Sequence, residues 1–197
     1  GRGERMRPLT DDCPKPLLKV GGKPLIEYHL ERLVDVGVER VVINLCWLGG
    51  MIKSHLGVGE RFGLSIDYSE EEEALETGGG IKKALPLLGE EPFWLVNGDV
   101  WTDYPFDHQD LNKGMGMHLV MVPNPAHNRE GDFAIAAGKL IETGDEKLTF
   151  SGLSIIDPDI ILNQSQERFP LVQVIREQMI NARCSAEKYL GQWNDVG

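Results

Sequence analysis

The chain opens with GRGERMRPLT at residues 1–10, and a lysine between two prolines follows as Pro14-Lys15-Pro16. Gly1 and Gly3 allow the backbone to approach a phosphate group more closely than a residue with a Cβ would. Arg5 offers a forked, permanently charged donor, and Lys15 adds a mobile point charge. The Rossmann fingerprint and the Walker A motif are both absent. The stretch therefore predicts a phosphate-binding loop of another kind, and a solvated basic N-terminus is the alternative interpretation.

Helices and strands are expected to alternate over the first half of the chain. Apolar residues at helical spacing, with Pro24 at the start and Gly37 at the end, predict the first helix. The predicted strands span residues 38–45, 64–68 and 93–96, and the further helices span residues 50–56 and 77–88. This alternation predicts an α/β protein with a Rossmann-like, mostly parallel sheet flanked by helices.

The second half shows fewer helices between its apolar runs. Strands are predicted at residues 118–122, 132–136, 148–156 and 188–196, and one helix at residues 171–179. A linker rich in Pro, Gly or Ser is absent from the sequence, so residues 1–197 are expected to form a single domain.

Composition narrows the class of partner. The 197 residues carry a formal net charge of −11, which argues against a general nucleic-acid-binding surface. Basic residues concentrated near the N-terminus instead suit a small anionic substrate. Cys13, Cys46 and Cys184 are widely spaced, which favours free thiols in a reducing cytoplasm. Apolar runs stay far below transmembrane length, so no membrane association is expected.

Asn97-Gly98-Asp99 directly follows the predicted strand at residues 93–96 and has two interpretations. Asn-Gly is a strong hairpin signal, and the apolar residues on either side could form the two arms. Alternatively, the segment lies at the carboxyl end of a parallel strand, where ligands gather in α/β sheets. There Asp99 could hold Mg²⁺ and Gly98 would let a substrate approach the backbone. Asp103 is expected to be a cap or a surface residue.

Glu76-Thr77-Gly78, at the start of the predicted helix over residues 77–88, also has two interpretations. Thr77 could be the N-cap of that helix. The glycines and the helix N-terminus could instead form a wall against which a base and a ribose lie.

The order of these motifs resembles the sugar-1-phosphate nucleotidyltransferases almost from end to end. The strings that carry the resemblance are GRGERMRPLT, PKPL at residues 14–17, GKPLI at 22–26, LETGGG at 75–80, NGDVWTD at 97–103 and DVG at 195–197. Within the family the chain looks most like short bacterial enzymes that uridylylate N-acetylmuramate 1-phosphate during cell-wall sugar recycling. Family members carry a strand before the first glycine and a helix after Asp-Val-Gly, so both ends of this sequence look truncated.

The resemblance assigns roles to individual residues. Asp99 and Asp195 match the two carboxylates that hold Mg²⁺, and Lys15 matches the lysine that offsets charge at the α-phosphate. The backbone of Gly1 and Gly3 and the side chain of Arg5 would grip the β- and γ-phosphates, while Glu76, Thr77 and Gly78 would contact the base. The residues implied for the sugar phosphate are Asn97, Gly98, Asp132, Ser151 and Gly152. Ser151 and Asp132 could equally belong to ordinary strands.

The activity implied is transfer of UMP from UTP to a sugar 1-phosphate, N-acetylmuramate 1-phosphate above all, with release of pyrophosphate. Three alternatives stay open. The first is a guanylyl- or thymidylyltransferase acting on mannose or glucose 1-phosphate. The second is a non-catalytic sugar-nucleotide-binding module, although Arg5, Lys15, Asp99 and Asp195 are all present. The third is a metal-dependent glycosyltransferase, which would leave the opening glycine-arginine stretch unexplained. Oligomeric state is not specified by any of these features.

Overall fold

The computed structural model describes residues 3, 6–107 and 110–196. Its smallest elements lie near the N-terminus: the 3-10 helix η2 (Lys15–Leu17) and the strands β1 (Lys19–Val20) and β2 (Lys23–Pro24), which pair with each other. A second 3-10 helix, η3 (Glu60–Phe62), precedes β4.

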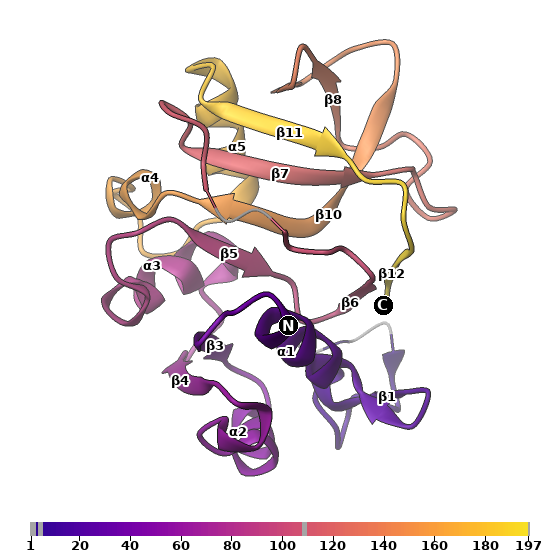
Figure 1. Ribbon diagram of the computed structural model, residues 1–197, viewed down its shortest axis with the longest axis vertical. Coiled ribbons are helices and arrows are strands. Elements are labelled where there is room, and N and C mark those ends of the chain that lie inside the picture. Colours follow the sequence, from indigo (N-terminus) through magenta and orange to yellow (C-terminus); the bar gives the residue numbers. More distant parts are fainter. Residues whose placement is uncertain (1–2, 4–5, 108–109, 197) are drawn as a thin grey trace.

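The first half alternates as the sequence predicts. Its elements are α1 (Leu25–Asp35), β3 (Arg40–Leu45), α2 (Gly49–Leu56), β4 (Ser65–Glu70), α3 (Glu76–Leu88) and β5 (Phe93–Val96). Strands β3 and β4 are parallel, with Arg40 opposite Ser65. The apolar stripe of α1 is buried, and Ile26 and Leu30 pack with Leu56 of α2 and Ile66 of β4 in one hydrophobic cluster. Helices α1 and α2 and strands β3 and β4 occupy the lower portion of Figure 1.

A six-stranded sheet occupies the upper portion of Figure 1, with the strand order β5-β10-β7-β11-β9-β8. Its members besides β5 are β7 (Met117–Val122), β8 (Phe133–Ala136), β9 (Lys139–Ile141), β10 (Lys147–Ile156) and β11 (Cys184–Lys188). The helices α4 (Pro158–Leu162) and α5 (Leu171–Ile180) share a cluster with α3 and the sheet, in which Ile81, Ile161 and Val174 pack with Leu119. A further cluster joins Leu33 of α1 to this sheet.

The α/β class is confirmed, but the expected mostly parallel pairing needs correction. Only β3–β4 and β7–β11 are parallel among the strand pairs of the described residues. Strand β10 instead runs antiparallel between β5 and β7. The reason is visible in the second half of the sequence, where short connections replace the long helical crossovers that parallel neighbours require.

The C-terminal strand prediction also needs correction. The residues between 184 and 196 form two strands, β11 and β12 (Trp193–Asp195), rather than one. Strand β12 leaves the large sheet and pairs antiparallel with β6 (Val100–Thr102). The cysteines are all free thiols, with Cys184 buried and Cys46 exposed. Across the described residues, the helices are too short or too polar to cross a bilayer.

Candidate active site

The segment Asn97-Gly98-Asp99 connects two sheets instead of turning a hairpin. The hydrogen-bonding edge of β5 is taken by β10, with Val96 opposite Leu153, while β6 pairs with β12. The hairpin interpretation is therefore wrong, because neither flanking strand pairs with the other. Asp99 lies just beyond the carboxyl end of β5, where α/β proteins place their ligands.

Lys15, in the 3-10 helix η2, contacts Asp99 in the segment that connects β5 to β6. Its Nζ lies 3.2 Å from Oδ2 of Asp99, and the two side chains are 12% and 44% exposed. The prolines next to Lys15 fix the backbone of η2, and a Cβ on Gly98 would stand 3.4 Å from Cγ of Pro16. The Pro-Lys-Pro segment thus packs directly over the Asn-Gly-Asp segment, and it holds the lysine beside the carboxylate.

Asp195 comes next to this pair through the short strand β12. Asp195 stands opposite Val100, and the backbone N–H of Val196 donates to the carbonyl oxygen of Asp99 at 2.7 Å. Oδ2 of Asp195 lies 3.0 Å from Nε2 of His127. The predicted metal carboxylates Asp99 and Asp195 are therefore neighbours in space, although they are almost a hundred positions apart in the sequence.

The chemistry of these two carboxylates fits a hard divalent cation. Within the described ranges of the chain, the contacts of both carboxylates are made through Oδ2, with Lys15 for Asp99 and with His127 for Asp195, and both side chains are partly open to solvent. Clusters of three or more His, Cys, Asp or Glu that could enclose a metal are absent from the described residues. Mg²⁺ commonly takes one or two carboxylates from a protein and completes its shell with water and substrate phosphates, so the two aspartates are suitable donors for that ion.

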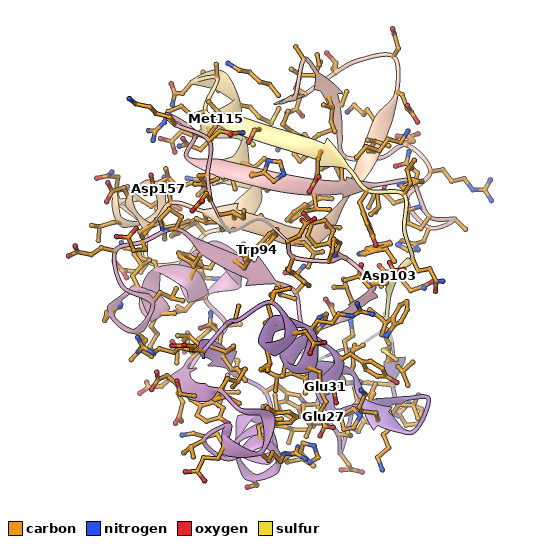
Figure 2. All side chains as sticks on the ribbon, viewed as in Figure 1. Glu27, Glu31, Trp94, Asp103, Met115 and Asp157 are labelled. Atoms are coloured by element: carbon orange, nitrogen blue, oxygen red, sulfur yellow. The ribbon has the colours of Figure 1, made fainter. Side chains whose placement is uncertain are left out.

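Asp103 fixes the position of β12. Its Oδ1 accepts hydrogen bonds from the hydroxyl of Tyr189 at 2.5 Å and from the backbone N–H of Gln192 at 2.7 Å. The Tyr189 hydrogen bond is the main cause that lowers the pKa of Asp103, and burial raises the pKa of Tyr189 to about 12. Figure 2 shows Asp103 beside the C-terminal segment. Asp103 is thus an anchor for the strand that carries Asp195, a role beyond the surface or cap residue expected from the sequence.

A cavity of about 550 Å³ lies beyond Asn97, which is a size common for small-molecule sites. It opens between the start of α3, the ends of β8 and β10, and the first turns of α5. The residues that line it are Thr77, Asn97, Gly131, Asp132, Phe133, Glu142, Lys147, Phe150, Pro170, Leu171, Val172, Ile175 and Arg176.

The predicted sugar-phosphate residues divide into two groups. Asn97 and Asp132 line the cavity, and Gly152 supports Asn97, because a Cβ on Gly152 would stand 2.7 Å from Nδ2 of Asn97. Ser151 does not reach the cavity: it is 1% exposed and donates to the carbonyl oxygen of Val120 at 2.7 Å. Gly98 lies under Pro16 instead. The surroundings of Ser151 are those of an ordinary buried strand residue.

Thr77 is not the N-cap of α3, in contrast to one of its two interpretations from the sequence. The helix begins at Glu76, so Thr77 is already inside it, and the N-cap is Leu75 without a side-chain hydrogen bond. Glu76 adopts a φ of 62°, which is uncommon for a residue with a side chain and recurs at ligand sites. Gly78 is required for packing, since a Cβ there would lie 2.4 Å from the ring of Phe169. Thr77 lines the cavity, whereas Gly78 is buried behind it.

The N-terminal phosphate loop is only partly described. Gly1 and Arg5 lie outside the described residues. Gly3 has a φ of 63°, and its carbonyl oxygen accepts a hydrogen bond from Oγ1 of buried Thr10 at 2.7 Å. A Cβ on Gly3 would stand 2.8 Å from Cγ2 of Thr10, so the close packing of these two residues requires a glycine at position 3.

Sequence reasoning missed the charged lining of the cavity, namely Glu142, Lys147 and Arg176. The sequence gives only weak signals for them: Lys147 stands where a charged stretch passes into an apolar strand, and Arg176 is a charged residue within the mainly apolar helix α5. Strand β9 and helix α5 bring Glu142 and Arg176 together across 34 positions, which local periodicity does not reveal.

The fold and the site together define an α/β protein with a lysine–aspartate pair at the end of a strand and a cavity of about 550 Å³ beside it. Residues 1–131 match the family model described as "Nucleotidyl transferase". The chain therefore belongs to the nucleotidyl transferase family.

Named relatives and solved structures agree with this membership. The chain is 46% identical to N-acetylmuramate alpha-1-phosphate uridylyltransferase of Neisseria meningitidis, over 100% of this chain and 90% of that protein. It is 33% identical to the protein of the same name from Caulobacter vibrioides, over 100% and 88% of the two chains. The crystal structure of a UDP-glucose pyrophosphorylase complexed with UDP-glucose has the same fold, with a TM-score of 0.75 at 19% identity over 100% of this chain and 90% of that one.

Proposed function

We propose that this protein transfers UMP from UTP to N-acetylmuramate 1-phosphate, giving the UDP-sugar and pyrophosphate. The observation that carries the proposal is the Lys15–Asp99 pair, 3.2 Å apart, with Asp195 on the adjoining strand and a cavity beside Asn97. The uridylyltransferase names of the Neisseria and Caulobacter relatives, at 46% and 33% identity, supply the nucleotide and the sugar.

The reaction is a single in-line displacement in this proposal. An oxygen of the sugar 1-phosphate attacks the α-phosphorus of UTP, a new P–O bond forms, and the bond to the leaving pyrophosphate breaks. Lys15 leaves Asp99 and moves to the α-phosphate, where its positive charge stabilises the negative charge that grows during attack. The backbone of Gly1 and Gly3 and the guanidinium of Arg5 hold the β- and γ-phosphates.

The remaining groups position the substrates. Asp99 and Asp195 would hold Mg²⁺, which when bound neutralises phosphate charge and lowers the cost of bringing two anions together. Glu76 and Thr77 would border the base, with Gly78 packed behind them against Phe169. Asn97 and Asp132 would border the sugar, and Gly152 would support Asn97. Holding the two substrates in line accounts for much of the rate, because the transfer leaves little covalent work to the protein.

We place the activity in the cytoplasm, in the recycling of cell-wall sugars. The three free thiols support a reducing compartment, and the substrates are small anions rather than nucleic acids or lipids. A monomer or a small homo-oligomer would serve equally well, since every proposed group comes from one chain.

Pyrophosphate release with Mg²⁺ tests the proposal. UTP is paired in turn with the 1-phosphates of N-acetylmuramate, N-acetylglucosamine, glucose and mannose, and GTP and dTTP then replace UTP. The proposal predicts the highest kcat/KM for UTP with N-acetylmuramate 1-phosphate and loss of activity with excess EDTA. A preference for GTP with mannose 1-phosphate, or for dTTP with glucose 1-phosphate, would favour the guanylyl- or thymidylyltransferase alternative. Binding of a UDP-sugar without turnover of any pair would favour the non-catalytic module.

A further inference from the structure

Lys147 is a cation that the cavity holds without an acidic partner. It begins β10, stands opposite Ala134 of β8, and lines the cavity. Its Nζ donates to the backbone carbonyl oxygen of Asp132 at 3.3 Å. Within the described part of the chain, no carboxylate oxygen lies within the 4.0 Å of this ammonium that an ion pair requires.

The other charged groups of the cavity are already matched. Arg176 forms a bidentate ion pair with Glu142: Nε donates to Oε2 at 3.2 Å and Nη2 donates to Oε1 at 3.1 Å. Asp132 accepts from Nδ2 of Asn128 at 3.1 Å and from the backbone N–H of Phe150 at 2.8 Å. Among the described residues that line the cavity, Lys147 is therefore the cation that a ligand can neutralise without first breaking an ion pair.

Lys147 also lies away from the reacting phosphate. The backbone N–H of Asn97, which follows β5 toward Asp99, donates to the carbonyl oxygen of Gly152 on β10 at 2.9 Å, and Lys147 stands five residues before Gly152 on the same strand. At about 3.3 Å per residue, and less through the bulge between Phe150 and Leu153, this separation is on the order of 10–15 Å. A group on the sugar that meets Lys147 is therefore a ring substituent other than the 1-phosphate.

We infer that Lys147 selects the sugar, by pairing its ammonium with a carboxylate carried on a ring carbon other than the one that bears the 1-phosphate. The ether-linked lactate of N-acetylmuramate is such a carboxylate, whereas N-acetylglucosamine has a neutral hydroxyl at that position. The inference rests on the proposed function, because it assumes that the cavity holds the sugar of the sugar 1-phosphate. Lys147 is a specificity residue in this account and takes no part in the chemical step.

Kinetics on a matched pair of variants test this inference. Lys147→Met keeps the length of the side chain and removes its charge. Lys139→Met is the control, because Lys139 on β9 also donates to a backbone carbonyl at 3.3 Å, that of Ala182, but lies outside the cavity lining. Each variant is assayed with UTP and either N-acetylmuramate 1-phosphate or N-acetylglucosamine 1-phosphate.

We expect Lys147→Met to lower kcat/KM for N-acetylmuramate 1-phosphate by about 10- to 100-fold, the usual cost of a lost hydrogen bond to a charged group. The loss should appear mainly in KM, the N-acetylglucosamine substrate should change less than about threefold, and Lys147→Arg should restore part of the preference. Lys139→Met should leave both substrates unaffected. An equal loss for both sugars would overturn the inference, since Lys147 would then bind the shared phosphate or support the fold. An unchanged preference would overturn it as well.

Calorimetric binding separates this inference from the proposed function. If the native protein transfers UMP to neither sugar, the proposed function fails, and the titration of each sugar 1-phosphate still tests Lys147. Tighter binding of the muramate compound by the native protein than by Lys147→Met supports the role of Lys147 in recognition. Equal binding by the two proteins contradicts it.

Discussion

Lys15 and Asp99 are 84 positions apart in the sequence, and their side chains meet at 3.2 Å at the carboxyl end of β5. The lysine is well shielded and the aspartate is half open, so the pair sits at the floor of a site rather than on a free surface. Such a contact keeps the lysine in place before substrates arrive. In the proposed reaction, phosphate oxygens of the nucleotide replace the carboxylate as the partner of Lys15.

Replacing Lys15 with Met should reduce turnover by about 100- to 1,000-fold, the usual cost of losing one charged contact to a developing negative charge. Stability should change by less than about 1 kcal/mol, because Asp99 is partly solvated and can be hydrated when its partner is lost. Steady-state rates and urea unfolding measure the two effects. Lys53→Met, which breaks the exposed contact to Glu70, is the control that should keep full activity. Activity of Lys15→Met within threefold of the native value would remove Lys15 from the reaction.

Replacing Asp103 with Ala should release β12 and with it Asp195. The variant loses acceptors for Tyr189 and for the backbone N–H of Gln192, which we expect to cost about 1–3 kcal/mol in the free energy of unfolding. The Mg²⁺ concentration needed for half-maximal rate should rise, because one proposed metal carboxylate is less well positioned. Asp67→Ala, which removes the exposed partner of Arg40, should change neither quantity appreciably. An unaltered Mg²⁺ dependence in Asp103→Ala would show that β12 does not depend on this anchor.

Replacing Gly78 with Ala should destabilise the protein, because the new methyl group would lie 2.4 Å from the ring of Phe169 and 2.8 Å from its carbonyl oxygen. Overpacking of this kind costs about 1–3 kcal/mol. Gly50→Ala is a matched control inside helix α2, where a Cβ meets nothing within 4 Å. It should be neutral or stabilising by up to about 1 kcal/mol, since alanine favours the helix. Equal unfolding midpoints for the two variants would contradict the close packing of α3.

His29 should make the protein less stable at mildly acid pH. Burial lowers the pKa of His29 below its ordinary value, against the opposing effect of its hydrogen bond to the carbonyl oxygen of Val100 at 2.7 Å. Between the unfolded pKa of about 6.5 and the lower folded pKa, the unfolded chain binds a proton that the folded chain does not. Stability should therefore fall as the pH drops from about 7.5 through 6.5.

His29→Gln isolates this contribution, because glutamine can still donate to Val100 but does not titrate. The free energy of unfolding, measured by urea at pH 7.5 and pH 5.5, should fall further for the native protein than for this variant. An identical pH dependence in the two proteins would mean that His29 titrates in the folded state as it does in the unfolded chain.

Local patterns in the sequence were sufficient for most of the first half of the fold. The helix at residues 25–35 and the strand at residues 93–96 follow from apolar spacing, Pro24 and Gly37, all of which act within a few residues. The pairing of strands was harder to predict. Strand β12 has three residues and finds its partner β6 about ninety positions earlier, so periodicity could not reveal it.

The residues of the candidate site could be predicted only where they belong to a short sequence motif. Lys15, Asp99 and Asp195 each belong to a recognisable string, and the structure brings them to neighbouring positions. Ser151 shows the limit of that approach, since a serine in an apolar strand gives no sign of the face on which it lies, and here it faces Val120. The acid–base pair of Glu142 and Arg176 depends on tertiary packing alone.

The most direct test of the account is the identity and amount of the products formed from UTP and N-acetylmuramate 1-phosphate in the presence of Mg²⁺, measured by mass spectrometry together with a pyrophosphate assay. We expect UDP-N-acetylmuramate and pyrophosphate in equal amounts, and a rate of formation of both that is about 100- to 1,000-fold lower in Lys15→Met. Unchanged sugar 1-phosphate in the presence of folded native protein, or release of orthophosphate and UDP in place of pyrophosphate, would contradict it.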